Sequence, residues 1–255
     1  MTQQPSSKET HVDAVVVGAG FAGLYMVYQL RGLGMSVRGI ERAPGVGGTW
    51  HWNRYPGARC DIESLDYCYG FDDDLLAQWR WTERYAAQPE ILAYLEHVAD
   101  RFGLRPDFTF DTSVLTAIWD EATTTWTVTT DRGEEITCQY VVMATGNLSQ
   151  PQPPDIAGLA DYQGKWLHTG NWPQDFVELS GKRVAVIGTG SSGIQTCTAI
   201  APLVAELYVL QRTPNYSMPA QNRPLTEDEI SSVLANYRER RTICEWSDAG
   251  TPLPD

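Results

Sequence analysis

Two segments of the chain show the same order of positions: a short apolar run, a glycine-rich turn, and apolar residues at helical spacing. In the first, DAVVVG at 13–18 precedes GAGFAGLYMVYQLRGLG at 18–34 and SVRGIER at 36–42. A short continuous apolar run is typical of a strand buried on both faces. The pattern predicts a βαβ unit with a parallel sheet. A long loop rich in glycine and aromatic residues is expected next, at 43–60.

The pattern recurs in the second half of the chain. RVAVIG at 183–188 predicts a strand, GTGSSGIQTCTAIA at 188–201 a helix, and ELYVLQR at 206–212 another strand. Two units of this kind in one chain predict an α/β fold with two Rossmann-like dinucleotide-binding domains.

Two further helices are predicted from their first residues. The segment QPE at 88–90 opens an amphipathic helix that reaches about Phe102, because proline suits a first turn and a carboxylate suits the positive end of the helix dipole. Thr226 precedes Glu229 at the spacing of a capping box. The helix that follows is expected to run to about Arg241.

The middle of the chain has the alternation of β-strands. Residues 113–119, 125–130 and 135–144 alternate in this way, and a turn at 131–133 separates the last two segments. We therefore expect an antiparallel β-meander inserted in the α/β fold. The proline-rich segment at 147–158 lacks periodicity, so it is expected to be a linker between domains.

Composition limits the classes of partner and compartment. The chain has 19 basic and 32 acidic residues, a net charge of −13, which argues against nucleic acid or an anionic membrane as the main partner. Its polar start has no apolar signal core, and no apolar run could span a bilayer. The cysteines form no CxxC pair, so we expect no metal site and no redox dithiol. A reducing cytoplasm is the expected location.

The first glycine-rich turn has the spacing of a phosphate-binding loop. Gly18, Gly20 and Gly23 form GxGxxG between a predicted strand and a predicted helix. The glycines permit a tight turn, a close approach of pyrophosphate to the backbone, and close helix–strand packing. Glu41 ends the next strand, where a carboxylate accepts from a ribose 2′-OH. This favours FAD here; a glycine turn without a ligand is the alternative.

The second loop has a different residue at the end of its second strand. Arg212 stands there, where the first unit has Glu41. A guanidinium binds a 2′-phosphate that a carboxylate would repel. NADPH is therefore expected here, although Arg212 could also be an ordinary solvated charge. The expected contact residues are Gly188, Thr189, Gly190, Ser191, Ser192, Gly193, Arg212 and Thr213.

Two longer motifs make the chain resemble a known family. The segment beginning at Tyr162 matches FxGxxxHxxxWP, a fingerprint of the Baeyer–Villiger monooxygenases, with tyrosine in place of phenylalanine. The segment GGTWHWNRYPGARCD at 47–61 is similar to the family's other marker. The amino-acid sequences of the segments at 61–71 and 88–102 most resemble those of phenylacetone, steroid and cyclic-ketone monooxygenases. The resemblance extends from Asp13 to about Arg241. The matching fingerprint residues are Tyr162, Gly164, His168, Trp172 and Pro173.

The resemblance implies a reaction and roles for residues. FAD and NADPH would use O2 to insert one oxygen atom beside a ketone carbonyl, giving an ester or lactone. Asp61 would lie near the flavin and pair with an arginine, although a loop cap is the simpler reading. His168 would couple domain movement to NADPH chemistry, or it is an ordinary buried histidine. Further expected cofactor contacts are Gly48, Thr49, Trp50, Asp61, Tyr67, Ala144 and Gly146, although residues 144–146 could equally be an ordinary strand-end turn.

The resemblance also sets expectations for domains and length. We expect a disordered tail at 1–12, an incomplete FAD-binding domain at 13–150, and a linker with an incomplete NADP-binding domain at 151–255. Family members are about twice as long, and the active-site arginine is expected beyond residue 255. The chain is then a fragment or a truncated product, and inactive alone. The alternatives are a monooxygenase that oxidises nitrogen or sulfur, and a non-catalytic dinucleotide-binding remnant.

Overall fold

The computed structural model describes residues 10–247, which form two compact units. The first unit holds the described residues up to Asn53 together with Leu92–Trp172, and the second holds Arg54–Ile91 with the described residues from Pro173. This division differs from the expected boundary at residue 150, which lies inside the first unit. The expected tail is also too long, because the first strand begins at Thr10; the rest of that tail lies outside the described residues.

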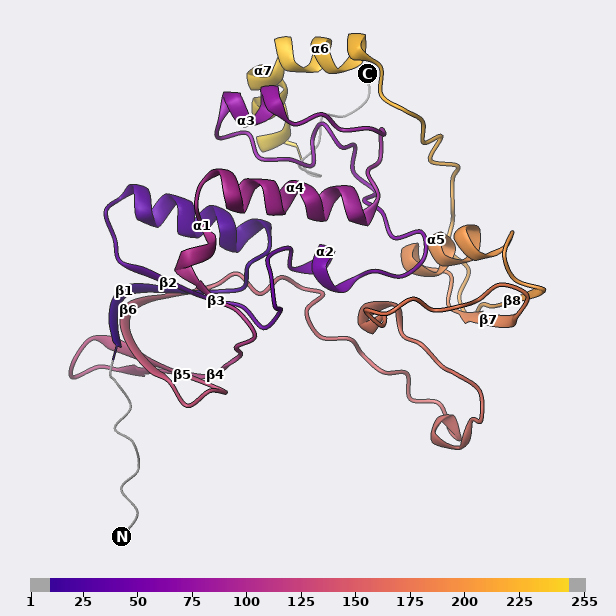
Figure 1. The fold of residues 1–255 in the computed structure, drawn as a ribbon, viewed down its shortest axis with the longest axis horizontal. Helices are drawn as coiled ribbons and strands as arrows, with labels where there is room; N and C mark the ends of the chain where they lie inside the picture. The colour runs from indigo at the N-terminus through magenta and orange to yellow at the C-terminus, as the bar shows by residue number, and fades with distance from the viewer. Residues whose placement is uncertain (1–9, 248–255) are drawn as a thin grey trace. The chain divides into compact units, whose positions relative to one another are not determined.

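The first unit contains a six-stranded sheet with the order β3-β2-β1-β6-β5-β4. β1 is parallel to both β2 and β6, whereas β5 is antiparallel to β4 and β6. Figure 1 shows α1 over one face of this sheet. The bounds are β1 Thr10–Val17, α1 Phe21–Gly32, β2 Val37–Ile40, β3 Phe108–Thr109, β4 Val114–Asp120, β5 Thr125–Thr130 and β6 Glu135–Met143.

The predicted βαβ unit and the predicted meander are both present. The last strand of the meander has a second role, because Val141 of β6 pairs in parallel with Val15 of β1. The parallel and antiparallel strands therefore share one hydrophobic core. Its fully buried members are Val15, Ile40, Val128, Ile136 and Cys138.

Short elements occupy the loops of the two units. The expected loop at 43–60 contains the helical turn α2 (Thr49–Trp52), and α4 (Gln88–Arg101) has nearly the predicted bounds. Among residues 10–247, no helix combines the length and the apolar character that crossing a membrane requires. The single-turn 3-10 helices are η1 Arg105–Asp107, η2 Leu159–Asp161 and η3 Thr169–Asn171.

The second unit contains a parallel pair of strands and four helices within its described residues. β7 (Arg183–Ile187) pairs with β8 (Glu206–Leu210), and α5 (Ser191–Ile200) connects them. Figure 1 shows α7 beside α3, and Arg238 of α7 forms an ion pair with Asp73 of α3 at 2.6 Å. The other helices are α3 Asp73–Gln78, α6 Glu227–Ala235 and α7 Tyr237–Glu245.

The helix predicted to run from Thr226 to about Arg241 is broken in two. The capping box forms as expected, with Thr226 and Glu229 bonded reciprocally. Asn236 then leaves the helical conformation, at φ −117° and ψ 18°. Its side-chain amide donates to the backbone oxygen of Ser232 at 3.2 Å. Asparagine competes in this way with the helical backbone pattern, so α6 ends and α7 starts in a new direction.

Candidate functional site

The first glycine loop follows β1 in the first unit. Gly18 has φ +106°, a conformation that side chains disfavour. A Cβ added there would lie 2.5 Å from the backbone oxygen of Ala144, and one on Gly23 would lie 1.8 Å from that of Gly18. Glycine is therefore required at both positions by the protein itself.

Gly20, the second glycine of this loop, begins the helix that follows it. It is the N-cap of α1, which has neither a side-chain cap nor an acidic residue in its first turn. The backbone N–H groups at this helix end suit an anion. A Cβ on Gly20 would lie 3.5 Å from the Cα of Gly48, an ordinary contact. The loop thus fits a pyrophosphate, and Gly48 closes one side of it.

Glu41 lies at the end of β2 and is only 6% exposed. Its Oε2 accepts a hydrogen bond from the backbone N–H of Ala19 at 2.6 Å, and its Oε1 accepts one from that of Ala43 at 2.7 Å. The carboxylate therefore holds the loop in place. Each oxygen retains a further lone pair, which can accept from a ribose hydroxyl.

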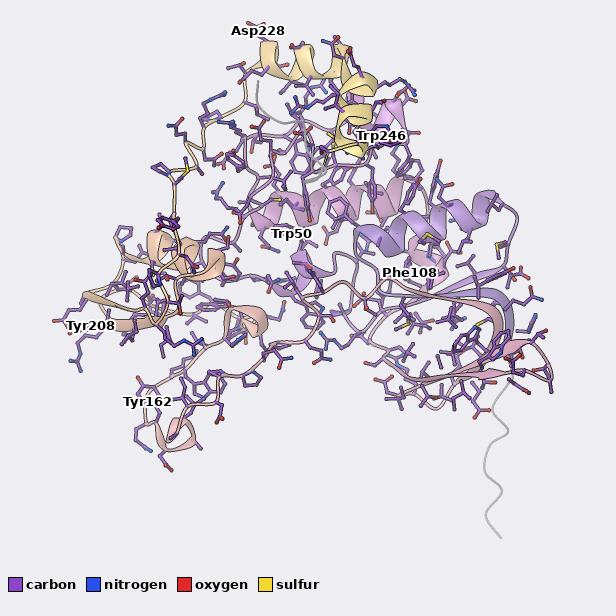
Figure 2. All side chains as sticks on the ribbon, turned by 180° about the vertical axis from the view of Figure 1, so that it is seen from behind. Trp50, Phe108, Tyr162, Tyr208, Asp228 and Trp246 are labelled. Atoms are coloured by element: carbon purple, nitrogen blue, oxygen red, sulfur yellow. The ribbon has the colours of Figure 1, made fainter. Side chains whose placement is uncertain are left out.

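The other residues expected near the first dinucleotide are spread over two turns. Trp50 (Figure 2) is buried in α2, which Thr49 begins. Ala144 contacts the loop, since a Cβ on Gly23 would lie 3.6 Å from its own Cβ. Gly146 has φ +66° and no heavy atom near its Cβ direction among the described residues. Ala144 thus lies at the loop, whereas a contact of Gly146 with the dinucleotide stays a prediction.

His168 caps the single-turn helix η3. Its Nδ1 accepts from the backbone N–H of Gly170 at 3.1 Å. A neutral imidazole that accepts at Nδ1 carries its proton on Nε2, so that nitrogen is available to donate. Earlier in the same fingerprint, a Cβ on Gly164 would lie 2.3 Å from the Tyr162 hydroxyl oxygen. Tyr162, labelled in Figure 2, thus explains the glycine two residues later.

The second glycine loop, in the second unit, repeats the backbone of the first. Gly188 has φ +100°, and its N–H donates to the backbone oxygen of Leu210 at 2.9 Å. A Cβ on Gly193 would lie 2.3 Å from the backbone oxygen of Gly188. Gly190 is the N-cap of α5 and has open space around its Cβ direction in the described structure. This loop also fits a pyrophosphate.

Residues after β8 hold the second loop. Thr189 is 9% exposed; its hydroxyl accepts from the Gln211 side chain at 2.7 Å, and its backbone oxygen accepts from the Asn215 side chain at 3.1 Å. The glycine motif gave no signal for either amide, although Gln211 and Asn215 flank the predicted Arg212-Thr213. Those two predicted residues are exposed at the end of the strand.

Asp61, from the 47–61 marker, contacts the first turn of α5. The hydroxyl of Ser191 donates to its Oδ2, and the Gln195 side chain donates to its Oδ1 at 3.0 Å. The sequence predicted that Asp61 lies near the flavin and did not suggest its contact with Ser191 and Gln195. Ser191 and Gln195 are four residues apart, a spacing that places them on one helix face.

Gln195 also binds the segment that precedes Asp61. Its Oε1 accepts from the Tyr55 hydroxyl at 2.8 Å and from the Arg59 N–H at 3.4 Å. Its Nε2 donates to the Arg59 backbone oxygen at 3.1 Å. Gly57, at φ +81°, approaches so closely that a Cβ there would lie 2.4 Å from the Gln195 backbone oxygen. One amide therefore fixes most of the second half of the 47–61 marker.

The environment of this marker shifts the pKa of two groups. Burial raises the pKa of Tyr55, a hydrogen bond with Ser192 opposes the shift, and the charge of Asp61 adds to it. Burial also raises the pKa of the Cys60 thiol to about 11, and Asp61 contributes to this shift. Both groups are therefore neutral at pH 7, and the Asp61 carboxylate is the local charge that they experience.

Tyr67, the last of the expected cofactor contacts, is half-buried in the second unit. Its backbone N–H donates to the backbone oxygen of Glu63 at 3.0 Å. The sequence assigned Tyr67 and Asp61 to the same cofactor as Gly48 and Trp50. The structure places the first two in the second unit and the other two in the first, so their joint role stays a prediction.

Comparison with known proteins gives a consistent match along the chain. The family model described as "Pyridine nucleotide-disulphide oxidoreductase" matches residues 12–241. A Baeyer–Villiger monooxygenase of Pseudooceanicola batsensis is 48% identical over 237 residues, which are 92% of this chain and 43% of the relative. A phenazine N-monooxygenase of Lysobacter antibioticus is 44% identical over 250 residues, covering 95% of this chain and 46% of the relative.

A solved structure agrees in fold. The structure of an oxidised steroid monooxygenase bound to NADP has 53% sequence identity and a TM-score of 0.91. The match covers 96% of this chain and 47% of that one. The chain therefore spans about half the length of the proteins that it resembles.

Proposed function

Because this chain belongs to the pyridine nucleotide-disulphide oxidoreductase family, we propose that it binds FAD at the loop before α1 and NADPH at the loop before α5. The observation that carries this assignment is the pair of complete phosphate loops with opposite charges at the ends of their second strands, Glu41 in β2 and Arg212 after β8. A carboxylate suits a free ribose, and a guanidinium suits a 2′-phosphate.

The reaction we propose is Baeyer–Villiger oxidation of a ketone to an ester or lactone. The resemblance to Baeyer–Villiger monooxygenases that the two markers indicate is confirmed by the relatives. The match covers less than half of those proteins, so the activity, the ketone and O2 belong to the proposal. In this reaction the reduced flavin activates O2.

The residues of this chain would orient and hold the two nucleotides. The N–H groups at the start of α1 and α5 bind the pyrophosphates. Glu41 orders the first loop through the backbone N–H groups of Ala19 and Ala43 and accepts from the ribose. His168 would keep an N–H on Nε2, which could donate a hydrogen bond as His168 couples domain movement to NADPH chemistry. The predicted pairing of Asp61 with an arginine beyond this chain completes the proposal.

The test is an assay of the full-length protein with FAD, NADPH, air and a panel of ketones. The expected products are esters or lactones that are heavier than the ketone by one oxygen atom. The amounts of NADPH and O2 consumed should each equal the amount of product formed. A protein that binds FAD and NADPH but oxidises no ketone would contradict the Baeyer–Villiger proposal and leave the cofactor assignment standing.

Nitrogen oxidation is the second candidate, because a phenazine N-monooxygenase is nearly as similar as the Baeyer–Villiger relative. The same assay separates the two when phenazines and tertiary amines are added to the panel. N-oxide products in place of esters would favour this second reaction.

We also propose a reducing cytoplasm as the location. All five cysteines are free thiols in the structure, and secreted proteins usually oxidise their cysteines to disulfides. Fractionation of the producing cells, followed by thiol labelling of the unfolded protein, tests this. A disulfide in the isolated protein would contradict it.

A further inference from the structure

The start of α5 already holds a negative charge in this structure. The loop of Gly188, Gly190 and Gly193 has the motif of a pyrophosphate site, and Ser191 is the first residue of the helix. The Ser191 hydroxyl donates to the carboxylate of Asp61. A hydroxyl has one proton to donate, so Ser191 cannot give that proton to a phosphate oxygen at the same time.

Asp61 is held at this position by the segment that carries it. Gln195 donates to Asp61 and, through its other contacts, fixes Tyr55 and Arg59. The contact of Gly57 with α5 leaves no room for a side chain. The segment therefore cannot be displaced from α5 without loss of several hydrogen bonds.

The charge of Asp61 is not neutralised by its hydrogen-bond partners in the described structure. Ser191 and Gln195 are both neutral donors. The basic residue closest to Asp61 in the sequence, Arg59, forms an ion pair with Glu83 at 2.7 Å. A dinucleotide pyrophosphate at this helix end would meet an uncompensated carboxylate.

We propose that Asp61 regulates the occupancy of the second phosphate loop by competing with the pyrophosphate for Ser191 and by repelling it, and that Gln195 is the positioning residue that keeps it there. The inference rests on the proposed binding of NADPH at this loop. Asp61 then has a role separate from any pairing near the flavin, because its charge weakens nucleotide binding and so speeds release of the nucleotide. Binding of the nucleotide must also loosen Asp61 from Ser191.

The test is titration of the oxidised, FAD-loaded full-length protein with NADP+ by calorimetry. Asp61→Asn keeps the shape and removes the charge. Its Kd for NADP+ should fall by about fivefold to tenfold at low salt, as expected for one charge at short range in a partly solvated site, and by less at high salt. Asp73→Asn is the matched control, since it removes one charge from an exposed ion pair in the same unit and should leave the Kd unchanged.

Ser191→Ala separates competition from repulsion. In that background Asp61→Asn can no longer free a hydroxyl proton for the phosphate. The improvement in the Kd for NADP+ that Asp61→Asn causes should therefore be about threefold smaller than in the wild type, a coupling within the range of contacting residues. Gln195→Leu tests the positioning role, because it removes the amide donor that holds Asp61; Asp61 should then leave Ser191, and the Kd for NADP+ should fall about twofold or more at low salt. This variant keeps the proposal testable if Asp61→Asn does not fold.

The outcomes separate the two proposals. An unchanged or higher Kd in folded Asp61→Asn overturns the regulatory role, while wild-type binding of NADP+ upholds the cofactor assignment. Failure of both wild type and Asp61→Asn to bind NADP+ overturns both. A tighter Kd with the predicted dependence on salt and on Ser191 supports the inference without any measurement of turnover.

Discussion

The two phosphate loops have nearly the same backbone and different surroundings. Gly18 and Gly188 have φ values of +106° and +100°. In each loop a Cβ on the third glycine would collide with the carbonyl oxygen of the first, at 1.8 Å in the first loop and 2.3 Å in the second. Around Gly18 and Gly20 the protein supplies close neighbours, whereas the described structure leaves the Cβ directions of Gly188 and Gly190 open.

The difference shows that the glycines fix the shape of the loop and that other residues decide what it binds. The first loop is ordered by Glu41, a buried carboxylate bonded to the loop backbone. The second loop is ordered by the side-chain amides of Gln211 and Asn215, which donate to Thr189, and Arg212 is exposed beside it. It also has an anion, Asp61, at its helix end. A nucleotide should therefore find a preformed first site and a more adjustable second one.

The largest expected effect comes from the third glycine. Gly23→Ala would place a methyl group 1.8 Å from the Gly18 carbonyl oxygen, so the full-length protein should lose about 3 kcal/mol or more of unfolding free energy and its FAD. Gly193→Ala, with a 2.3 Å approach, should cost less and spare FAD. Urea unfolding and flavin absorbance measure both. Equal stability of the two variants would contradict the comparison.

Gly20→Ala separates the needs of the ligand from those of the fold. The added Cβ makes an ordinary 3.5 Å contact with Gly48, so the protein should keep its stability. If pyrophosphate approaches the backbone at Gly20 as proposed, the methyl group should obstruct it, and the Kd for FAD should rise about tenfold, or ~1.4 kcal/mol. The control is Gly48→Ala, which is strained at φ +53° and should lower stability. Titration of the apoprotein with FAD measures the Kd, and an unchanged Kd in folded Gly20→Ala would show that FAD is not at this loop.

Arg212 tests the chemical difference between the loops. A charge-assisted hydrogen bond is worth about 1.5–3 kcal/mol, so Arg212→Ala should raise the KM for NADPH about tenfold or more and change that for NADH little. Arg212→Lys retains the charge without the paired donors and should be intermediate. Steady-state kinetics with both nucleotides decide the question. Equal losses for NADPH and NADH would make Arg212 a structural residue.

Local patterns were sufficient for the repeated βαβ units, the meander and α4. Each of these depends on the spacing of apolar residues within one segment and on residues at its ends. The break at Asn236 was missed because the apolar spacing continues across it, whereas the bond from its side chain to the Ser232 backbone oxygen is visible only in the structure. The length of the N-terminal tail was misjudged because His11 pairs with Thr137, a partner far along the chain.

The composition of the two units could not be predicted from local patterns. Residues 54–91 and the segment from Pro173 form one unit, although the linker-like segment at 147–158 suggested a boundary there. The contact of Asp61 with Ser191 has the same origin, since the two residues are brought together by tertiary packing. The glycine motifs located the loops correctly, but their neighbours Gln195, Gln211 and Asn215 required the structure.

The smallest expected effect concerns His168, which lies between the two loops in the sequence. Its side chain makes a single neutral hydrogen bond, to Gly170, among the described residues. Such a bond is worth about 0.5–1.5 kcal/mol, so His168→Ala should lower the unfolding free energy only slightly and should keep FAD bound. If His168 couples the two nucleotide sites, stopped-flow absorbance should nevertheless show slower reduction of the flavin by NADPH. His168→Gln retains an acceptor for the Gly170 N–H and should restore stability without restoring the rate. Reduction of the flavin at the wild-type rate in His168→Ala would leave His168 as a cap of η3, and the two loops would then work without it.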